Sequence, residues 1–303
     1  MKKLYIVLLL NVWTILLWGQ HRLGVSIGGM ATYQFDNIEI ATSKLGYGGE
    51  FGAIYQLQKK KFLFQTGLNV DYSLLLHDVD SISFSKDMVD FDGISYTYKS
   101  LFYNRIDKAE VIELSVPLMF GFNYSSFYLL LGPKFFYPLT AQTTQTALLT
   151  TYGDYNGMFY ENFEDMPQHG YVKDQYISSK GKIDFLYDVR ACVELGGSWN
   201  LSSTNDESSH LALGVFAEYG ILNVLKGGNN ELANIDYSQC VNSKLNHIYS
   251  TTLTNNAFVN NFRMGLRVTL LFHVAGDSNA RKNKKCMCID YINRKHPVYR
   301  KRR

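Results

Sequence analysis

From residue 20 onward, the chain alternates apolar and polar side chains with a period of two. The alternation persists in eight segments, each about 10 to 15 residues long, the length of a tilted strand that crosses a membrane. Successive side chains of a strand point to opposite faces, so each segment would have one apolar and one polar face. The segments are residues 22–34, 45–57, 62–76, 110–124, 127–139, 183–199, 210–224 and 261–274.

The composition agrees with strands. The chain has 22 Tyr and 19 Phe but only 5 Pro, a balance that favours β-structure over disorder or helical bundles. No apolar run after residue 20 reaches the roughly 20 residues that a membrane-spanning helix needs. Any contact with a membrane must therefore use strands.

The connections between the segments alternate in length. Residues 59–61, 125–126 and 201–209 are short, and residues 35–44 are intermediate; the long polar connections are residues 77–109, 140–182 and 225–260. Short turns at one end and long loops at the other are typical of outer-membrane barrels. We therefore predict an all-β fold: an eight-stranded antiparallel up-and-down transmembrane β-barrel with short periplasmic turns and long extracellular loops.

The alternation alone does not decide which face is inside. In a soluble barrel of the lipocalin kind, the apolar face would line a ligand cavity and the charges would meet water. Two patterns favour the opposite orientation. The polar face is rich in glycine, as a crowded interior requires, and the apolar face carries aromatic residues near both of its ends. The aromatic positions are Tyr55, Phe62, Phe64, Phe122, Tyr124, Phe127, Trp199 and Phe272 near the short turns, and Tyr33, Tyr47, Tyr72, Tyr137, Tyr187, Tyr219 and Phe262 near the loops.

The face predicted to point inward carries both acids and bases. Eight strands enclose an interior just wide enough for side chains, so these groups would pair across the lumen and plug it. A narrow gated channel is the alternative. The predicted lumen charge network is Glu50, Asp71, Glu113, Lys134, Asp184, Asp188, Arg190, Glu194, Glu218, Arg263 and Arg267.

The amino-terminal end of the chain suggests export. Lys2 and Lys3 precede the apolar stretch Leu4–Trp18, and Gly19 is a small exit residue, the order of a signal peptide. A single amino-terminal membrane anchor is the alternative. We predict a signal peptide at residues 1–19, the barrel at residues 20–275 and a disordered basic periplasmic tail at residues 276–303.

The tail has ten Lys or Arg and one acid between residues 281 and 303. In an exported protein, the anions available to it are lipid head groups, sugar polymers and other proteins, so we expect no nucleic-acid partner. We expect contacts with outer-membrane lipids and lipopolysaccharide, and a possible periplasmic partner for the tail. Cys286 and Cys288 in the tail have too few companions for a zinc site.

Catalytic and metal-binding patterns are weak. His77 lies beside Asp78 and Asp80, and His169 follows Glu164 and Asp165, but neither histidine has a recognisable nucleophile pattern. The acidic run from Asp87 to Gly93 lacks the spacing of an EF-hand loop. We therefore predict no catalytic residues, no metal site and no cofactor.

Two adjacent segments resemble a known family. Ile112–Gly121, with Glu113 and Pro117, and Phe127–Lys134, with Gly132-Pro133, resemble the "lEiPll…yl.aGp" signature of the PorT-like outer-membrane β-barrel family, and Glu218–Val224 resembles its "eYgltNi" ending. The resemblance spans most of residues 21–274. It implies a small barrel in the bacterial cell outer membrane, in a family mostly without an assigned role, whose named member takes part in exporting proteins through an outer-membrane secretion machine.

The function predicted from the sequence is a non-enzymatic outer-membrane barrel with a plugged polar lumen that acts as an envelope scaffold. The alternatives are a PorT-like accessory of protein secretion, a hydrolase with its site at the barrel rim, and a narrow channel.

Overall fold

The computed structural model describes residues 19–36, 41–90, 92–155, 171–182, 185–201, 209–224 and 259–275. Its strands are β1 (Gln20–Asp36), β2 (Ala41–Lys44), β3 (Gly46–Lys59), β4 (Phe62–Val79), β5 (Ile82–Val89), β6 (Ser95–Tyr124), β7 (Phe127–Asp154), β8 (Gln175–Lys182), β9 (Asp188–Asn200), β10 (Ser209–Gly220) and β11 (Val259–Ala275).

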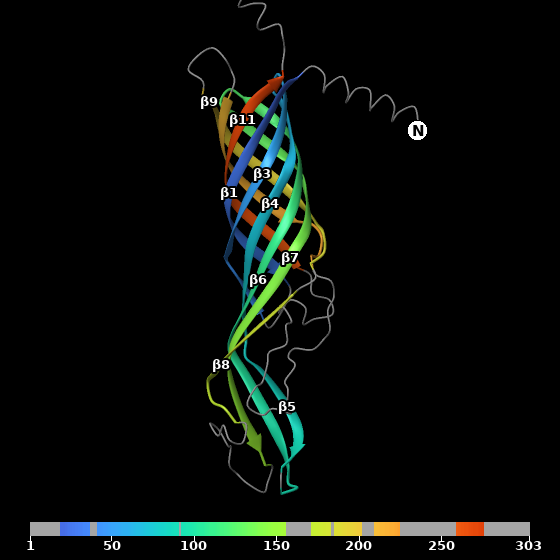
Figure 1. Cartoon of the computed structure of the whole chain (residues 1–303), viewed down its shortest axis with the longest axis vertical. Coiled ribbons are helices and arrows are strands. Elements are labelled where there is room, and N and C mark those ends of the chain that lie inside the picture. Colours follow the sequence, from blue (N-terminus) through green and yellow to red (C-terminus); the bar gives the residue numbers. More distant parts are fainter. Residues whose placement is uncertain are drawn as a thin grey trace, which may run out of the picture.

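Eight strands form a closed antiparallel ring in the order β1-β3-β4-β6-β7-β9-β10-β11, and β11 pairs with β1 to close it. Each strand of the ring pairs with its neighbour along the chain, so the barrel is of the up-and-down type. The predicted eight-stranded antiparallel barrel is confirmed. Figure 1 shows the barrel in the upper part of the molecule, with its short turns at the top.

Within the described ranges, no helix is long and apolar enough to cross a membrane.

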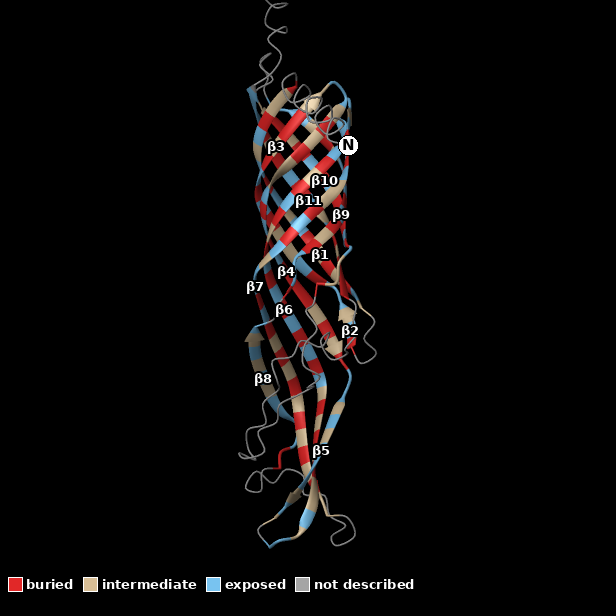
Figure 2. Ribbon diagram, turned by 90° about the vertical axis from the view of Figure 1, so that its right-hand side faces the viewer, coloured by how far each residue is buried: buried red, intermediate tan, exposed pale blue. Residues whose placement is uncertain are grey.

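The barrel is polar inside and apolar outside. Along β7, Phe127, Leu129 and Leu131 are 69%, 38% and 52% exposed, whereas Tyr128 and Leu130 between them are buried. Figure 2 shows the same alternation of buried and exposed positions on the barrel strands. Most of the exposed positions carry large apolar side chains, so the outer surface of the barrel suits an apolar environment better than water.

Two of the predicted long loops contain regular structure. Residues 77–109 and 140–182 include β5, β8 and the far ends of β6 and β7, which form a four-stranded antiparallel extension in the order β8-β7-β6-β5. Figure 1 shows this extension below the barrel. The outward face here carries Thr and Lys, so the alternation of hydropathy fades, although threonine still favours strands. We refer to residues 82–89, 95–110, 140–154 and 171–182 as the extension.

An irregularity at Asn104 divides β6 within the extension. Asn104 has a positive φ of 50°, and the β6–β7 register shifts between Tyr103 and Ile106. One extra residue on β6 reverses which positions face inward: Phe102 is buried on one side of the shift and Arg105 on the other. The bulge therefore lets one continuous strand serve two differently built interiors.

The interior of the extension is a small apolar core. Phe102, Ala147, Leu149 and Val172 are buried together, and Phe84 and Ile177 pack against them. Farther out, the rings of Tyr98 and Tyr171 stack with centroids 6.1 Å apart, and burial raises the pKa of the Tyr171 hydroxyl.

One predicted strand begins later than expected. The alternation placed a strand at 183–199, but β9 begins at Asp188. Phe185, expected on the outward face, is instead buried in a cluster with Leu75, Val111 and Val259. Because Phe185 precedes the strand, the alternation of β9 does not set its direction.

Pro117 opens the pairing of β6 with β4 locally. The ladder reaches Thr66 opposite Leu118 and resumes at Asn69 opposite Ser115 in the same register. This agrees with proline's missing backbone donor.

Candidate functional site

The candidate site is the lumen of the barrel, where charged side chains from seven of the eight ring strands meet. Ten of the predicted network residues lie there, and each is at most 4% exposed. The eleventh, Asp184, lies outside the described residues. We call these ten the lumen network: Glu50, Asp71, Glu113, Lys134, Asp188, Arg190, Glu194, Glu218, Arg263 and Arg267.

Lys134 is one centre of the lumen network. Its Nζ on β7 lies 2.9 Å from Glu50 Oε2 on β3, 3.0 Å from Glu218 Oε1 on β10 and 3.3 Å from Asp71 Oδ1 on β4. The Ser115 hydroxyl also donates to Asp71. One ammonium group thus joins carboxylates from three other strands across the lumen.

Arg267 on β11 forms the second centre. Its Nη2 donates to Glu50 Oε2 at 2.9 Å and its Nε donates to Glu50 Oε1, a bidentate pairing. Its Nη1 donates to Glu194, which also accepts a 2.7 Å hydrogen bond from the Tyr128 hydroxyl. Glu50 therefore links the two centres.

A third group lies toward the loops. Arg190 donates from Nε to Asp188 at 2.6 Å and from Nη2 to Glu113 at 2.9 Å and 3.2 Å. Arg263 donates to the same Glu113 carboxylate. Arg190 Nη1 lies 4.0 Å from Glu218 Oε2, so this group adjoins the first centre.

Two buried aromatic rings contact the cations. The Arg190 guanidinium lies 3.6 Å from the centroid of the Phe136 ring, and Lys134 and Arg263 lie 4.9 Å and 5.1 Å from it. The Arg267 guanidinium lies 4.5 Å from the centroid of Phe216. Cations over ring faces are attracted to the negative face of the ring, so these rings keep four positive charges close together.

Glycines on the same face make room for these long side chains. A Cβ at Gly28 would lie 2.8 Å from Glu50 Oε1, and one at Gly214 would lie 2.5 Å from the Tyr128 hydroxyl and 2.8 Å from Glu194 Oε1. All three distances are too short for a real side chain. The glycines of β1 and β10 therefore set the space for the network.

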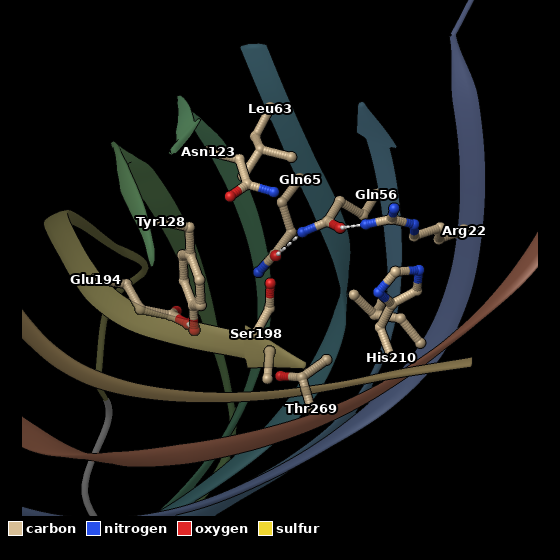
Figure 3. A pocket seen from close by; sticks show the side chains of 12 residues that line it. Arg22, Gln56, Leu63, Gln65, Asn123, Tyr128, Glu194, Ser198, His210 and Thr269 are labelled. Carbon is tan, nitrogen blue, oxygen red and sulfur yellow. Dashed lines mark hydrogen bonds between the residues drawn. The ribbon is translucent and has the colours of Figure 1, made fainter. Parts of the chain in front are cut away.

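The lumen is filled on both sides of the lumen network. On the loop side, the cluster of Leu75, Val111, Phe185 and Val259 forms an apolar layer. On the short-turn side lies a cavity of about 10 Å³, room for roughly one water molecule. Figure 3 shows Arg22, Gln56 and Gln65 joined in a row by hydrogen bonds at this cavity, with Tyr128 and Glu194 on its wall.

The rim candidate His77 points into the barrel, not out of it. Its side chain is fully buried, with Nε2 3.0 Å from Ser43 Oγ and 3.1 Å from Asp36 Oδ2, while Ser43 donates to Asp36 at 2.6 Å. A catalytic triad places the acid on the opposite ring nitrogen from the nucleophile. Here both contacts fall on the same nitrogen, so the three residues are not arranged as a triad.

The other candidates from the sequence either help to build a turn or lie outside the described residues. Asp90 Oδ1 accepts the backbone N–H groups of Asp92 and Ile94, which builds the turn between β5 and β6. His169 and the tail lie outside the described ranges. Among the residues that are described, no group of three or more His, Cys, Asp or Glu side chains is arranged to hold a metal ion.

Sequence reasoning missed the aromatic members of the interior, because it treated aromatic residues as outward. Tyr128, Phe136 and Phe216 share the inward parity of Lys134 and Glu218, a signal that could have placed them. It also missed a buried pair in the extension: Arg105 donates twice to Asp107 at 2.9 Å, and Gln145 donates to Asp107 at 3.1 Å.

Comparisons with known proteins add similar structures but no family. No protein-family model and no curated protein sequence matches the chain. Neisserial surface protein A is 11% identical, with a TM-score of 0.25, and the match covers 81% of this chain and 95% of that one. The outer-membrane protease OmpT from Escherichia coli is 9% identical, with a TM-score of 0.30, and the match covers 84% of this chain and 97% of that one.

Proposed function

We propose that the protein is a bacterial outer-membrane β-barrel with a closed lumen, and that it acts as a non-enzymatic scaffold that carries the extension outside the cell. The observation that carries this proposal is the lumen network, which joins seven strands by ion pairs. A channel would need an open path, whereas here charged side chains bind one another across the interior.

The outer surface supports the membrane location. On β11, the outward side chains run from Phe262 to Phe272 with Met264, Leu266 and Val268 between them. Ten residue steps at about 3.3 Å give about 33 Å along the strand, or about 25 Å in height at a tilt near 40°. That height matches the apolar band of an outer-membrane barrel.

Two measurements test the proposal. The protein should fractionate with the outer membrane and show heat-modifiable gel mobility, and in planar bilayers it should give little ion conductance. A soluble periplasmic product would contradict the membrane location. Large, stable single-channel steps would contradict the closed lumen.

The non-enzymatic part is tested separately. Purified protein should not hydrolyse lipids or peptides above the level of a His77→Ala variant. Hydrolysis by the unmodified protein that disappears in that variant would instead assign a catalytic role to the cluster of Asp36, Ser43 and His77.

A second candidate role is that of a secretion accessory. The residues that resemble the PorT-like family lie opposite one another in the β6–β7 ladder, with Pro117 paired with Lys134 of the lumen network. Pull-downs with and without residues 276–303 test this role. A partner that is lost on truncation would support it, and an unchanged set of partners would argue against a docking tail.

A further inference from the structure

Three exposed lysines lie in one row across neighbouring strands, two on the outer face of the extension and one on β2. Lys44 of β2 pairs with Leu76 of β4, Leu76 pairs with Lys108 of β6, Lys108 pairs with Thr144 of β7, and Thr144 pairs with Lys180 of β8. We call Lys44, Lys108 and Lys180 the lysine row. All three are exposed.

The spacing within the lysine row is regular. Each lysine is two strands from the next, which corresponds to about 9.5 Å. A phosphate between two neighbours is therefore within reach of both flexible ammonium groups. Lys182, exposed on β8 opposite Gln142, adds a fourth positive charge one position closer to the barrel on the same face.

The position of the lysine row along the barrel axis matches the layer of lipid head groups. The apolar outer surface of β6 ends at Ile112, which pairs with the exposed Tyr72. Lys108 is four residues farther along, about 13 Å along the strand and about 10 Å in height at the usual tilt. The head-group layer lies beyond the apolar core, and a lysine side chain is long and flexible, so the ammonium groups of the row are within reach of that layer.

The acidic residues near the lysine row do not cancel its positive charge. Lys44 forms an ion pair with Asp78, and both side chains are about half exposed, so water screens the pair. Glu110 is exposed one position closer to the barrel than Lys108. Among the residues that the structure describes here, four lysines thus face two carboxylates.

The row occupies one side of the barrel. On the opposite side of the ring, the loop-side ends of β1, β10 and β11 carry Phe35, Tyr219 and Phe262, and the Phe35 ring contacts the other two. Aromatic rings suit the apolar boundary, whereas lysines suit phosphate groups. The two sides therefore suit different parts of a lipid layer.

We infer that the lysine row, with Lys182, binds the phosphate groups of the phosphorylated glycolipid that forms the outer leaflet of the outer membrane. The inference rests on the proposed membrane location and adds the residues and the lipid chemistry to it.

The test uses the full-length protein in detergent, titrated with purified lipopolysaccharide and with the same lipid after phosphatase treatment. A variant with Lys44→Gln, Lys108→Gln and Lys180→Gln should bind the phosphorylated lipid about tenfold more weakly or worse. The matched control, Lys59→Gln with Lys60→Gln and Lys61→Gln, removes the same charge at the short-turn end. Its binding should equal that of the unmodified protein.

Two further measurements separate lipid recognition from folding and from free phosphate. Lysine-to-arginine substitutions in the row should keep binding, and inorganic phosphate should compete only at concentrations far above those of the lipid. Three outcomes would each overturn the inference. The row variant could bind the lipid as tightly as the unmodified protein, or the control could lose as much affinity as the row variant. The unmodified protein could also bind the dephosphorylated lipid as tightly as the phosphorylated one. Fractionation and heat modifiability of the unmodified protein test the proposed function independently.

Discussion

The two halves of the β6–β7 hairpin, barrel and extension, are built with opposite polarity. In the barrel, Glu113 and Lys134 face inward while Phe120 and Leu131 face outward. In the extension, Phe102 and Leu149 face inward while lysines and threonines face outward. In the proposed location, lipid surrounds the barrel and water surrounds the extension. The charged side chains of the barrel therefore lie inside it, and the extension has an apolar core.

The largest expected effect tests the interior of the barrel. Glu50→Ala removes the carboxylate shared by Lys134 and Arg267 and leaves both cations buried, so it should lower the free energy of unfolding by about 3–5 kcal/mol. Urea unfolding in detergent measures this change. Glu110→Ala removes the same group from the exposed face of β6 and should change stability by less than about 0.5 kcal/mol. Equal effects would mean that the lumen network does not hold the barrel together.

The next effect tests the interior of the extension. Phe102→Ala should cost about 3 kcal/mol, because it empties part of a small apolar core. The loss should be local, with rapid proteolysis between residues 82 and 110 while the barrel keeps its heat-modifiable mobility. Phe120→Ala, on the outer face of the same strand, should leave the proteolysis of the extension unchanged. Simultaneous loss of both parts would show that they unfold as one unit.

A smaller effect tests the outer surfaces. Leu266→Arg places a charge at mid-height on the apolar outside of the barrel and should cost at least about 2 kcal/mol in a lipid bilayer. Ile106→Arg, outward in the extension, should cost about 0.5 kcal/mol or less, because its surroundings are water. Folding equilibria in lipid vesicles compare the two. If Ile106→Arg lowered stability as much as Leu266→Arg, the outer faces of the barrel and the extension would not have different surroundings.

The smallest effect tests the bulge at Asn104 on β6. Asn104→Ala should cost about 1 kcal/mol, because a side chain without a local hydrogen-bonding group is disfavoured at a positive φ, whereas Asn104→Gly should cost less. Thermal unfolding of both variants measures the difference. A glycine variant that is the less stable of the two would argue against a left-handed residue at this bulge.

The eight barrel strands could be predicted because their two environments differ sharply. Arg263 and Arg267 share one parity and Met264 and Leu266 the other, and the predicted 261–274 lies within β11. The fold class therefore followed from the alternation together with the lengths of the connections. The partner of each charge did not follow, because pairing across the lumen depends on the register of strands distant in the sequence, as for Lys134 and Glu50.

The extension could not be predicted in the same way. Its outward threonines and its partly polar interior, which includes Arg105, Asp107 and Gln145, blur the contrast between faces. The bulge at Asn104 then reverses the parity within a single strand. The expected signal peptide, Asp184, His169 and the basic tail lie outside the described residues and stay predictions.

β6 runs as one strand from Ser95 to Tyr124, through the bulge at Asn104, and this length has a mechanical consequence. Thirty residues at about 3.3 Å make a strand of about 100 Å, tied on both edges by hydrogen bonds perpendicular to its length. A pull on the outer tip acts along this strand, so the ladder bonds are loaded together in shear and do not open one after another. Tension applied at the surface would thus be carried directly to the wall of the barrel.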